Sequence, residues 1–213
     1  MTQEIAIERS AQEPFLKNGY LVSRPGSSEA IYIDPGDEAP QIIQHVEEHG
    51  FQLTAIVNTH AHLDHISGIE RVKQKWDIPI YLHPEDQFLY DGLAEQAQWF
   101  GLTCNPAPPV THTLRAGEDL QLSQLCFKVH ATPGHSPGSV SLEIGEHIFS
   151  GDVIFAGSIG RTDLPGGSLE ILMATIQECI LPLGDSKILH PGHGPDTTIG
   201  QERLHNPFLT GEA

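Results

Sequence analysis

The heptapeptide THAHLDH, at residues 59–65, holds three histidines and an aspartate directly after a short apolar run. Imidazole nitrogens and carboxylate oxygens are ligands that zinc, iron and manganese accept in proteins. His60 and His62 leave the end of a predicted buried strand, where a loop can aim both rings at one point. Asp64 and His65 begin the next predicted helix and can aim at a neighbouring point. The spacing therefore predicts a site for two metal ions.

Three later segments place further ligand-type residues beside glycine at the predicted ends of strands. They are TPGHSPG at 132–138, SGD at 150–152 and HPGHGP at 190–195. Glycine lets the backbone turn sharply, so that the next polar side chain projects from the edge of a sheet. Four separated loops thus supply seven candidate ligands, which are His60, His62, Asp64, His65, His135, Asp152 and His193.

Short apolar runs and amphipathic segments alternate along the chain, which is typical of an α/β protein. The predicted strands are 15–22, 30–33, 53–57, 120–122, 125–130, 139–144, 147–150 and 187–189. The predicted helices are 39–49, 66–76, 84–100, 168–180 and 198–205. Strands in two groups, with helices between and after them, predict two sheets packed face to face with the helices outside.

The length and composition predict one ordinary domain, residues 1–213, with 38% hydrophobic and 18% charged residues. Cys104, Cys126 and Cys179 lie far apart and show no Cys-x-x-Cys spacing, so neither a disulfide framework nor a thiolate metal site is expected. No apolar run approaches the roughly 18 residues of a membrane span. The first residues show no export signal, so a cytoplasmic location is expected.

The formal net charge of −17 argues against a nucleic-acid partner, because phosphates require clustered Lys and Arg residues, and this chain has only 11 in all. The same charge gives no general attraction for an anionic substrate. An anion must therefore be recognised locally, by a metal or by one or two placed cations. We expect a small-molecule substrate and no membrane partner, and the sequence leaves the oligomeric state open.

The motifs THAHLDH, PGHSPGS, SGD and PGHG, in this order, resemble those of the metallo-β-lactamase superfamily over nearly the whole chain. The resemblance implies a four-layer αβ/βα sandwich of two mixed sheets with a dinuclear site at one edge. The stretches SGDVIFAGSIGRTDLPGG and HPGHGPDTTIGQERLHNPFL are most similar to the short bacterial glyoxalase II type. These enzymes are hydroxyacylglutathione hydrolases without a C-terminal helical domain. The resemblance thus implies hydrolysis of a glutathione thioester, S-lactoylglutathione, in methylglyoxal detoxification.

The resemblance also assigns the ligands to two ions. His60, His62 and His135 would hold one metal, Asp64, His65 and His193 the other, and Asp152 would bridge them. Zinc is the first expectation for both ions, and iron or manganese are the alternatives. A water shared by two metals becomes a nucleophile near neutral pH. Asp64, which would also orient that nucleophile, and Asp152 are therefore the candidate catalytic residues.

A substrate-binding cation is implied nine residues after the bridging aspartate, at Arg161. In glyoxalase II proteins the cation at this position meets the glutathione part of the substrate, and a guanidinium fork suits a carboxylate. The longer enzymes carry an aromatic residue where this chain has Asp163. An internal ion pair between Arg161 and Asp163 is the alternative role for this arginine.

Three other functions remain open. A persulfide dioxygenase of the same superfamily would bind one iron through His60, His135 and Asp152, and its members share the Gly-Arg-Thr-Asp of residues 160–163. A lactonase or another esterase would use the same site. A protein that only stores or senses metal is disfavoured, because storage needs neither a bridging carboxylate nor a cation beside the site.

Overall fold

The first sheet uses the N-terminal half of the chain, of which the structure, a computed structural model, describes residues 4–212. In sheet order its strands are β1 (Ala6–Gln12), β2 (Lys17–Ser23), β3 (Glu29–Ile33), β4 (Gln52–Val57), β5 (Ile80–Leu82) and β6 (His112–Thr113). The first three strands pair antiparallel, and β3 to β6 pair parallel. β3 and β4 are nearly continuous apolar runs, because parallel strands are covered on both faces.

The second sheet uses the C-terminal half. In sheet order its strands are β14 (Thr197–Thr198), β13 (Ile188–Pro191), β10 (His147–Gly151), β9 (Val140–Ile144), β8 (Leu125–Ala131) and β7 (Asp119–Leu122). β10 and β13 are parallel, and the other neighbours are antiparallel. A separate hairpin, β11 (Ile154–Phe155) with β12 (Ser158–Ile159), follows β10. Both main sheets are therefore mixed.

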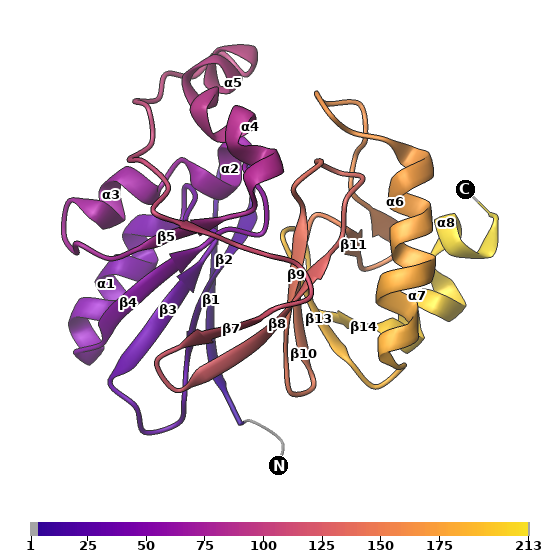
Figure 1. The fold of residues 1–213 in the computed structure, drawn as a ribbon, viewed down its shortest axis with the longest axis horizontal. Coiled ribbons are helices and arrows are strands. Elements are labelled where there is room, and N and C mark those ends of the chain that lie inside the picture. Colours follow the sequence, from indigo (N-terminus) through magenta and orange to yellow (C-terminus); the bar gives the residue numbers. More distant parts are fainter. Residues whose placement is uncertain (1–3, 213) are drawn as a thin grey trace.

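The helices lie on the outer faces of the two sheets (Figure 1). On the first sheet these are α1 (Ala39–His49), α2 (Leu63–Ile66) and α3 (Ile69–Lys73), with η1 (Pro84–Asp86), α4 (Gln87–Asp91) and α5 (Leu93–Trp99) at one end. On the second sheet they are α6 (Leu169–Thr175), η2 (Ile176–Ile180), η3 (Leu181–Leu183), α7 (Ile199–His205) and α8 (Pro207–Thr210). The predicted four-layer αβ/βα sandwich is thus confirmed.

The hydrophobic core between the sheets joins side chains from both of them. Tyr20 and Ile33 of the first sheet belong to one buried cluster with Phe127 and Phe149 of the second. Separate clusters fill the space between each sheet and its own helices. Because residues alternate along a strand, each sheet can contribute to the central cluster with one face and to an outer cluster with the other. That the whole chain forms one domain stays a prediction.

Two predicted helices are interrupted at glycine. The predicted helix at 66–76 is divided into α2 and α3 at Gly68, whose backbone N–H donates to the carbonyl of Pro35 instead of to its own helix. A Cβ atom at Gly68 would lie 2.3 Å from the carbonyl oxygen of Gly36, so glycine allows this close approach. The predicted helix at 84–100 is divided into η1, α4 and α5, with the break at Gly92. Both predictions of a continuous helix were wrong, because apolar spacing does not show a close tertiary approach or a change of helix direction.

The sequence patterns also missed β1, β5, β6, the β11–β12 hairpin, β14 and α8. β1 is an edge strand whose residues are mostly exposed, so it lacks the apolar run by which a buried strand is found. The strand predicted at 15–22 begins only at Lys17. Among residues 4–212, no helix has the length and apolar character needed to cross a bilayer.

Candidate metal centre

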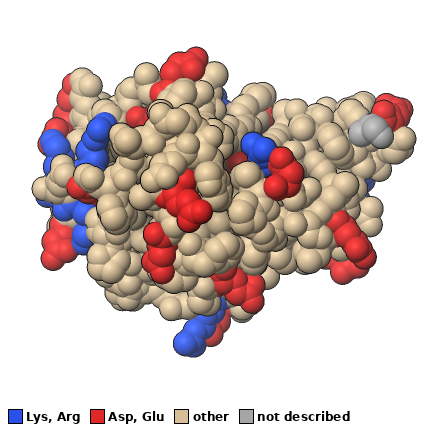
Figure 2. All heavy atoms as spheres, turned by 90° about the horizontal axis from the view of Figure 1, so that it is seen from above, with Lys and Arg blue, Asp and Glu red and all other residues tan. Residues whose placement is uncertain are grey.

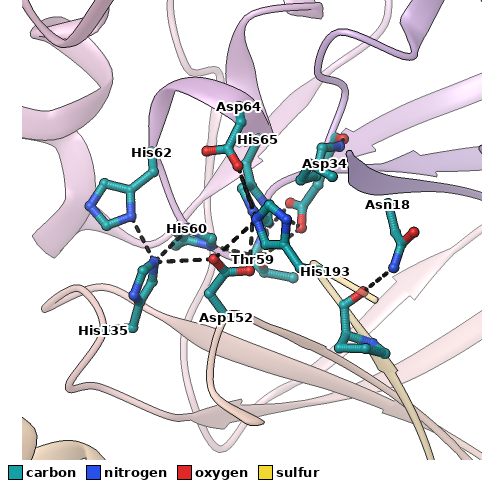
Figure 3. A network of polar contacts seen from close by, with 12 residues as sticks. Asn18, Asp34, Thr59, His60, His62, Asp64, His65, His135, Asp152 and His193 are labelled. Atoms are coloured by element: carbon teal, nitrogen blue, oxygen red, sulfur yellow. Dashed lines mark hydrogen bonds and ion pairs between the residues drawn. The ribbon is translucent and has the colours of Figure 1, made fainter. Parts of the chain in front are cut away.

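All seven candidate ligands meet at the edge where strands of both sheets end (Figure 3). The loop between β4 and α2 and the first turn of α2 carry His60, His62, Asp64 and His65, and the β8–β9 loop carries His135. Asp152 directly follows β10, and His193 lies between β13 and β14. The structure thus brings together residues that are up to 133 positions apart in the sequence. That they bind metal stays a prediction, which the geometry supports as follows.

The first group consists of three buried histidines. The Nε2 atom of His135 lies 2.7 Å from Nδ1 of His62 and 3.1 Å from Nε2 of His60. Zinc binds imidazole nitrogen at about 2.0–2.1 Å, so nitrogens this close together can share one ion. The three rings therefore converge on a single point, as the first group of ligands requires.

The second group lies beside the first, and Asp152 connects them. His193 Nε2 is 3.1 Å from Asp64 Oδ2, and His65 Nε2 is 3.8 Å from the same oxygen. Asp152 Oδ1 lies 3.2 Å from His65 Nε2, while its Oδ2 lies 3.5 Å from His135 Nε2 and from His193 Nε2. One carboxylate thus reaches both groups, which is the arrangement that a bridging ligand needs.

Hydrogen bonds on the outer sides of the rings turn lone pairs toward the centre. His135 Nδ1 lies 2.7 Å from the backbone oxygen of Arg161, which can only accept, so this nitrogen carries the proton. His65 Nδ1 lies 3.0 Å from Asp34 Oδ2 and donates to it. In both rings Nε2 is therefore the atom that faces the other ligands. Such outer partners fix the ring orientation of histidines that bind metal.

Asp34 also orients His60, through Thr59. The carboxylate of Asp34 accepts the backbone N–H and the hydroxyl of Thr59, each at 2.7 Å. The Thr59 oxygen then accepts from His60 Nδ1 at 3.1 Å, so that His60 Nε2 also presents its lone pair inward. The sequence analysis missed Asp34. Its signal was an aspartate directly after an apolar strand, the same pattern that marks the other ligand loops.

Three buried atoms of the candidate ligands lack a hydrogen-bond partner within the described part of the chain, namely His62 Nε2, His65 Nε2 and Asp152 Oδ1. The last two face each other at 3.2 Å. Buried polar atoms are nearly always paired, so unpaired ones call for an explanation. A cation between these two atoms would satisfy both. The residues present therefore fit two metal ions of the zinc, iron or manganese kind.

The electrostatics of the centre also favour cations. Burial together with the neighbouring rings of His65 and His135 holds the pKa of His60 well below its usual range, so this ring is neutral. Burial opposes a charge on His65 too, but the carboxylates of Asp152, Asp64 and Asp34 raise its pKa to about 10. Three carboxylates that hold a proton so firmly also attract a metal ion, which would displace that proton on binding.

The residue before the last candidate histidine, Gly192, has no room for a side chain. A Cβ atom at this position would lie 2.0 Å from Asp152 Oδ1 and 2.7 Å from the Cε1 atom of His65. These distances are far below any van der Waals contact. Only glycine allows the backbone before His193 to pass this close to the other ligands.

A cavity of about 320 Å³ opens over the centre. Its walls are mainly apolar and include Phe15, Trp99, Phe100 and Phe155. Arg161 also lines it, with Nε and Nη2 donating to the two carboxylate oxygens of Asp163 at 2.7 and 2.8 Å. The structure thus realises the internal ion pair and still places Arg161 at the cavity. Figure 2 shows the Lys and Arg side chains of the face seen from above mainly at its left edge, with isolated ones near the centre and at the lower edge.

The other polar residues suggested by the motifs have different roles. Ser136 donates to Asp86 at 2.7 Å and does not contact a ligand side chain. His190 packs against Phe149, lies 2.9 Å from His147 and pairs with Asp196 at 3.2 Å. Of the motif residues outside the ligand set, Thr59 is thus the one whose side chain contacts a candidate ligand.

Replacing Asp34 by asparagine is expected to weaken metal binding about 10- to 100-fold, the usual weight of such an outer partner. The amide cannot accept all three hydrogen bonds that orient His60 and His65. Titration of the metal-free protein against a chelator measures the effect. The exposed Asp77, which pairs with Lys73, provides the control Asp77→Asn. Unchanged metal affinity in Asp34→Asn would contradict the role given to this residue.

Comparison with known proteins shows which family this chain is similar to. A model described as the metallo-β-lactamase superfamily matches residues 13–193. Hydroxyacylglutathione hydrolase GloC of Haemophilus influenzae is 42% identical over 188 residues, which cover 86% of this chain and 89% of that protein.

Two solved structures are also similar over nearly their whole length. BLEG-1, a B3 metallo-β-lactamase, is 40% identical with a TM-score of 0.91, covering 97% of this chain and 100% of that one. TTHA1623, solved in a di-iron-bound form, is 39% identical with a TM-score of 0.86, covering 95% and 100%.

Proposed function

The chain belongs to the metallo-β-lactamase superfamily, and we propose that it is a dinuclear metal-dependent hydrolase that cleaves S-lactoylglutathione to lactate and glutathione. One observation carries the proposal: the Asp152 carboxylate lies within reach of both ligand groups, 3.2 Å from His65 and 3.5 Å from His135. The similarity to GloC supports a hydroxyacylglutathione as substrate. The di-iron form of TTHA1623 supports a site for two ions and keeps iron beside zinc as a candidate.

When bound, two divalent ions would supply an activated water and would polarise the carbonyl oxygen of the thioester. Asp64 lines the cavity and pairs with His193, so its carboxylate is placed to orient that water. Burial raises the pKa of Asp64, but the rings of His65 and His193 lower it to about 2. Asp64 is therefore ionised at neutral pH and can accept a hydrogen bond from the attacking water.

The remaining residues of the cavity bind the substrate, and the hydrolysis requires no nucleophile from the protein. Cys104, Cys126 and Cys179 are absent from its walls, as far as these are described. A thiol has a pKa of about 8.5, so the departing thiolate needs little or no protonation. We assign the apolar walls to the acyl and methylene parts of the substrate, and Arg161 to a carboxylate of glutathione.

The alternatives would use the site differently. A dioxygenase with one iron would need only His60, His135 and Asp152. The atoms of Asp64, His65 and His193 nevertheless lie within 4.8 Å of one another, as in a second metal group. This convergence favours the hydrolase. A lactonase or another esterase remains the second alternative, and the similarity to BLEG-1 adds β-lactams to the substrates to be compared.

The deciding experiment measures the metal content of protein purified without added metal, together with thiol release from S-lactoylglutathione. About two ions per chain with thiol release support the proposal. One iron per chain, no thiol release and oxygen uptake with glutathione persulfide would establish the dioxygenase instead. Two ions without thiol release would direct attention to the lactone and β-lactam substrates.

Arg161 provides a test of substrate recognition. We expect Arg161→Gln to raise KM for S-lactoylglutathione about tenfold, because a charge-assisted hydrogen bond contributes about 1.5 kcal/mol, while kcat changes little. Asp163→Ala, which frees the guanidinium, is expected to lower KM by up to about fivefold, since an exposed ion pair contributes only weakly. Steady-state kinetics measure both effects.

The control for this test is Arg115→Gln, because Arg115 is an exposed arginine outside the cavity walls and has a carboxylate neighbour, Glu118, at 3.8 Å. Its KM should equal that of the wild type. If Arg161→Gln leaves KM unchanged while the enzyme still cleaves the thioester, Arg161 serves only the pair with Asp163, and another group recognises the substrate.

A further inference from the structure

Two buried polar side chains of the 84–99 segment face the ligand loops without belonging to the ligand set. Asp86 is 0% exposed and Gln96 is 3% exposed. They lie at the start of the segment, in η1, and in α5, at the end of the molecule that carries the metal centre (Figure 1). Apart from the carbonyl of Leu89 in α4, to which Gln96 donates, their partners are backbone groups and a serine next to His60, His62 and His135. Buried groups with this many partners fix the position of what they bind.

Gln96 and Asp86 hold the residues on both sides of His62. Gln96 Oε1 accepts the backbone N–H of Leu63 at 3.0 Å, and Gln96 Nε2 donates to the carbonyl of Ala61 at 3.0 Å. Asp86 Oδ2 accepts the backbone N–H of Ala61, also at 3.0 Å. The backbone before and after His62 is therefore fixed by side chains from outside its own loop.

Asp86 binds the second histidine loop with the same carboxylate. Its Oδ2 accepts the hydroxyl of Ser136 at 2.7 Å, and its Oδ1 accepts the backbone N–H of Gly138 at 2.6 Å. These residues directly follow His135. One carboxylate thus ties the loop of His60 and His62, which leaves the first sheet, to the loop of His135, which leaves the second.

The opposite metal group is held from another element. Asn18 of β2 forms no hydrogen bond with the three-histidine group. Its Nδ2 donates to the carbonyls of Pro191 and Gly194, at 2.9 and 2.8 Å. Its backbone N–H donates to the carbonyl of Gly192 at 2.7 Å. These three residues surround His193, and Figure 3 shows Asn18 on that side of the centre.

We propose that Asp86 and Gln96 are positioning residues mainly for the three-histidine group and Asn18 mainly for the loop of His193, so that the two metal sites of this chain have separately adjustable affinities. This inference rests on the proposed binding of two metal ions and does not depend on the substrate. Loss of the Asp86 carboxylate lets the two histidine loops separate, which weakens the ion held by His60, His62 and His135. Loss of the Asn18 side chain weakens the ion held with His193.

The test is a titration of the metal-free protein with Co²⁺, followed by NMR of the exchangeable ring protons that the bound ion shifts. The three-histidine group should give three such signals and the other group two. In Asp86→Asn, whose amide meets N–H donors, the three signals should need about 10- to 100-fold more Co²⁺, with the two others unchanged. Gln96→Glu should act on the same three, and Asn18→Ala on the other two.

A matched control separates positioning from general stability. Glu202 is another buried carboxylate with three partners, Gly157, Thr197 and Asn206, none of them adjacent to a ligand. Glu202→Gln should lower the thermal midpoint and leave both Co²⁺ sites intact. Where Asp86→Asn does not fold, Ser136→Ala removes a single donor and should weaken the three-histidine signals about two- to tenfold.

Several outcomes would overturn the inference. Asp86→Asn and Asn18→Ala could weaken the same signals, Glu202→Gln could produce the loss expected of Asp86→Asn, or a folded Ser136→Ala could bind Co²⁺ like the wild type. Failure of the thioester assay would leave the inference standing, because the Co²⁺ signals report on the ligand groups without any substrate. Absence of Co²⁺ binding in the wild type would overturn both proposals.

Discussion

Replacing Asp152 by asparagine is expected to lower kcat/KM for thioester hydrolysis about a thousandfold or more and to remove at least one metal ion per chain. Asp152 is the residue that reaches both ligand groups, with contacts of 3.2 Å to His65 and 3.5 Å to His135 and His193. Its pKa lies well below the usual range, because the ring of His65 outweighs the effect of burial, so the native side chain is a carboxylate. A neutral amide cannot bridge two cations.

The expected size follows from what the two ions would contribute together. Lewis-acid polarisation and activation of water are worth several kcal/mol, and about 4 kcal/mol corresponds to a factor of about a thousand. Elemental analysis and thiol release on the same preparation measure the effect. Asp185→Asn, an exposed carboxylate that pairs with Arg203, should change neither quantity. Activity of Asp152→Asn within tenfold of the wild type would be incompatible with a bridging role.

The convergence of the seven candidate ligands could be predicted from the sequence, because each of them sits in a short motif with its own local reason. Glycine before His135, Asp152 or His193 marks a sharp turn at the end of a strand. The close spacing of three histidines and an aspartate in residues 59–65 predicts two neighbouring points at which ligand atoms converge. The same local reasoning gave the two groups of strands, and from them the two sheets.

The contacts between the ligand loops and the residues that hold them could not be predicted in this way. Asp34 is 25 positions from Thr59, and Asp86 is 50 positions from Ser136, so no local pattern connects either pair. Gln96 lies among helical residues, where a glutamine usually faces water. These side chains acquire their roles only when the fold brings the loops together, and their signal in the structure is burial with several hydrogen bonds.

The cavity and Arg161, the one Lys or Arg among the described residues of its walls, bear on how glutathione would bind. The walls formed by Phe15, Trp99, Phe100 and Phe155 cannot satisfy the charges of a tripeptide. Those charges must remain near the opening, where Arg161 is about half exposed. The thioester itself, which is apolar apart from its carbonyl, would then be the part that enters toward Asp64 and Asp152.

Replacing Asp64 by asparagine is expected to lower kcat by about 10²- to 10⁴-fold while much of the metal content persists. The amide oxygen can still bind a metal, and His65, His193 and Asp152 remain as ligands of the second ion. The lost property is the negative charge that orients the attacking water and accepts its hydrogen bond, and a placed base contributes a factor of this size. KM should change little, because Asp64 is assigned no contact with glutathione.

This variant also separates an enzyme from a protein that only stores metal. Thiol release and metal content are measured on matched preparations of wild type and Asp64→Asn, each supplied with the same metal. Lost turnover with retained metal means that the carboxylate serves chemistry, which storage does not need. Equal turnover in both proteins would remove Asp64 from the mechanism. No turnover in either, over the whole panel of thioesters, lactones and β-lactams, would leave metal storage as the function that the seven ligands support.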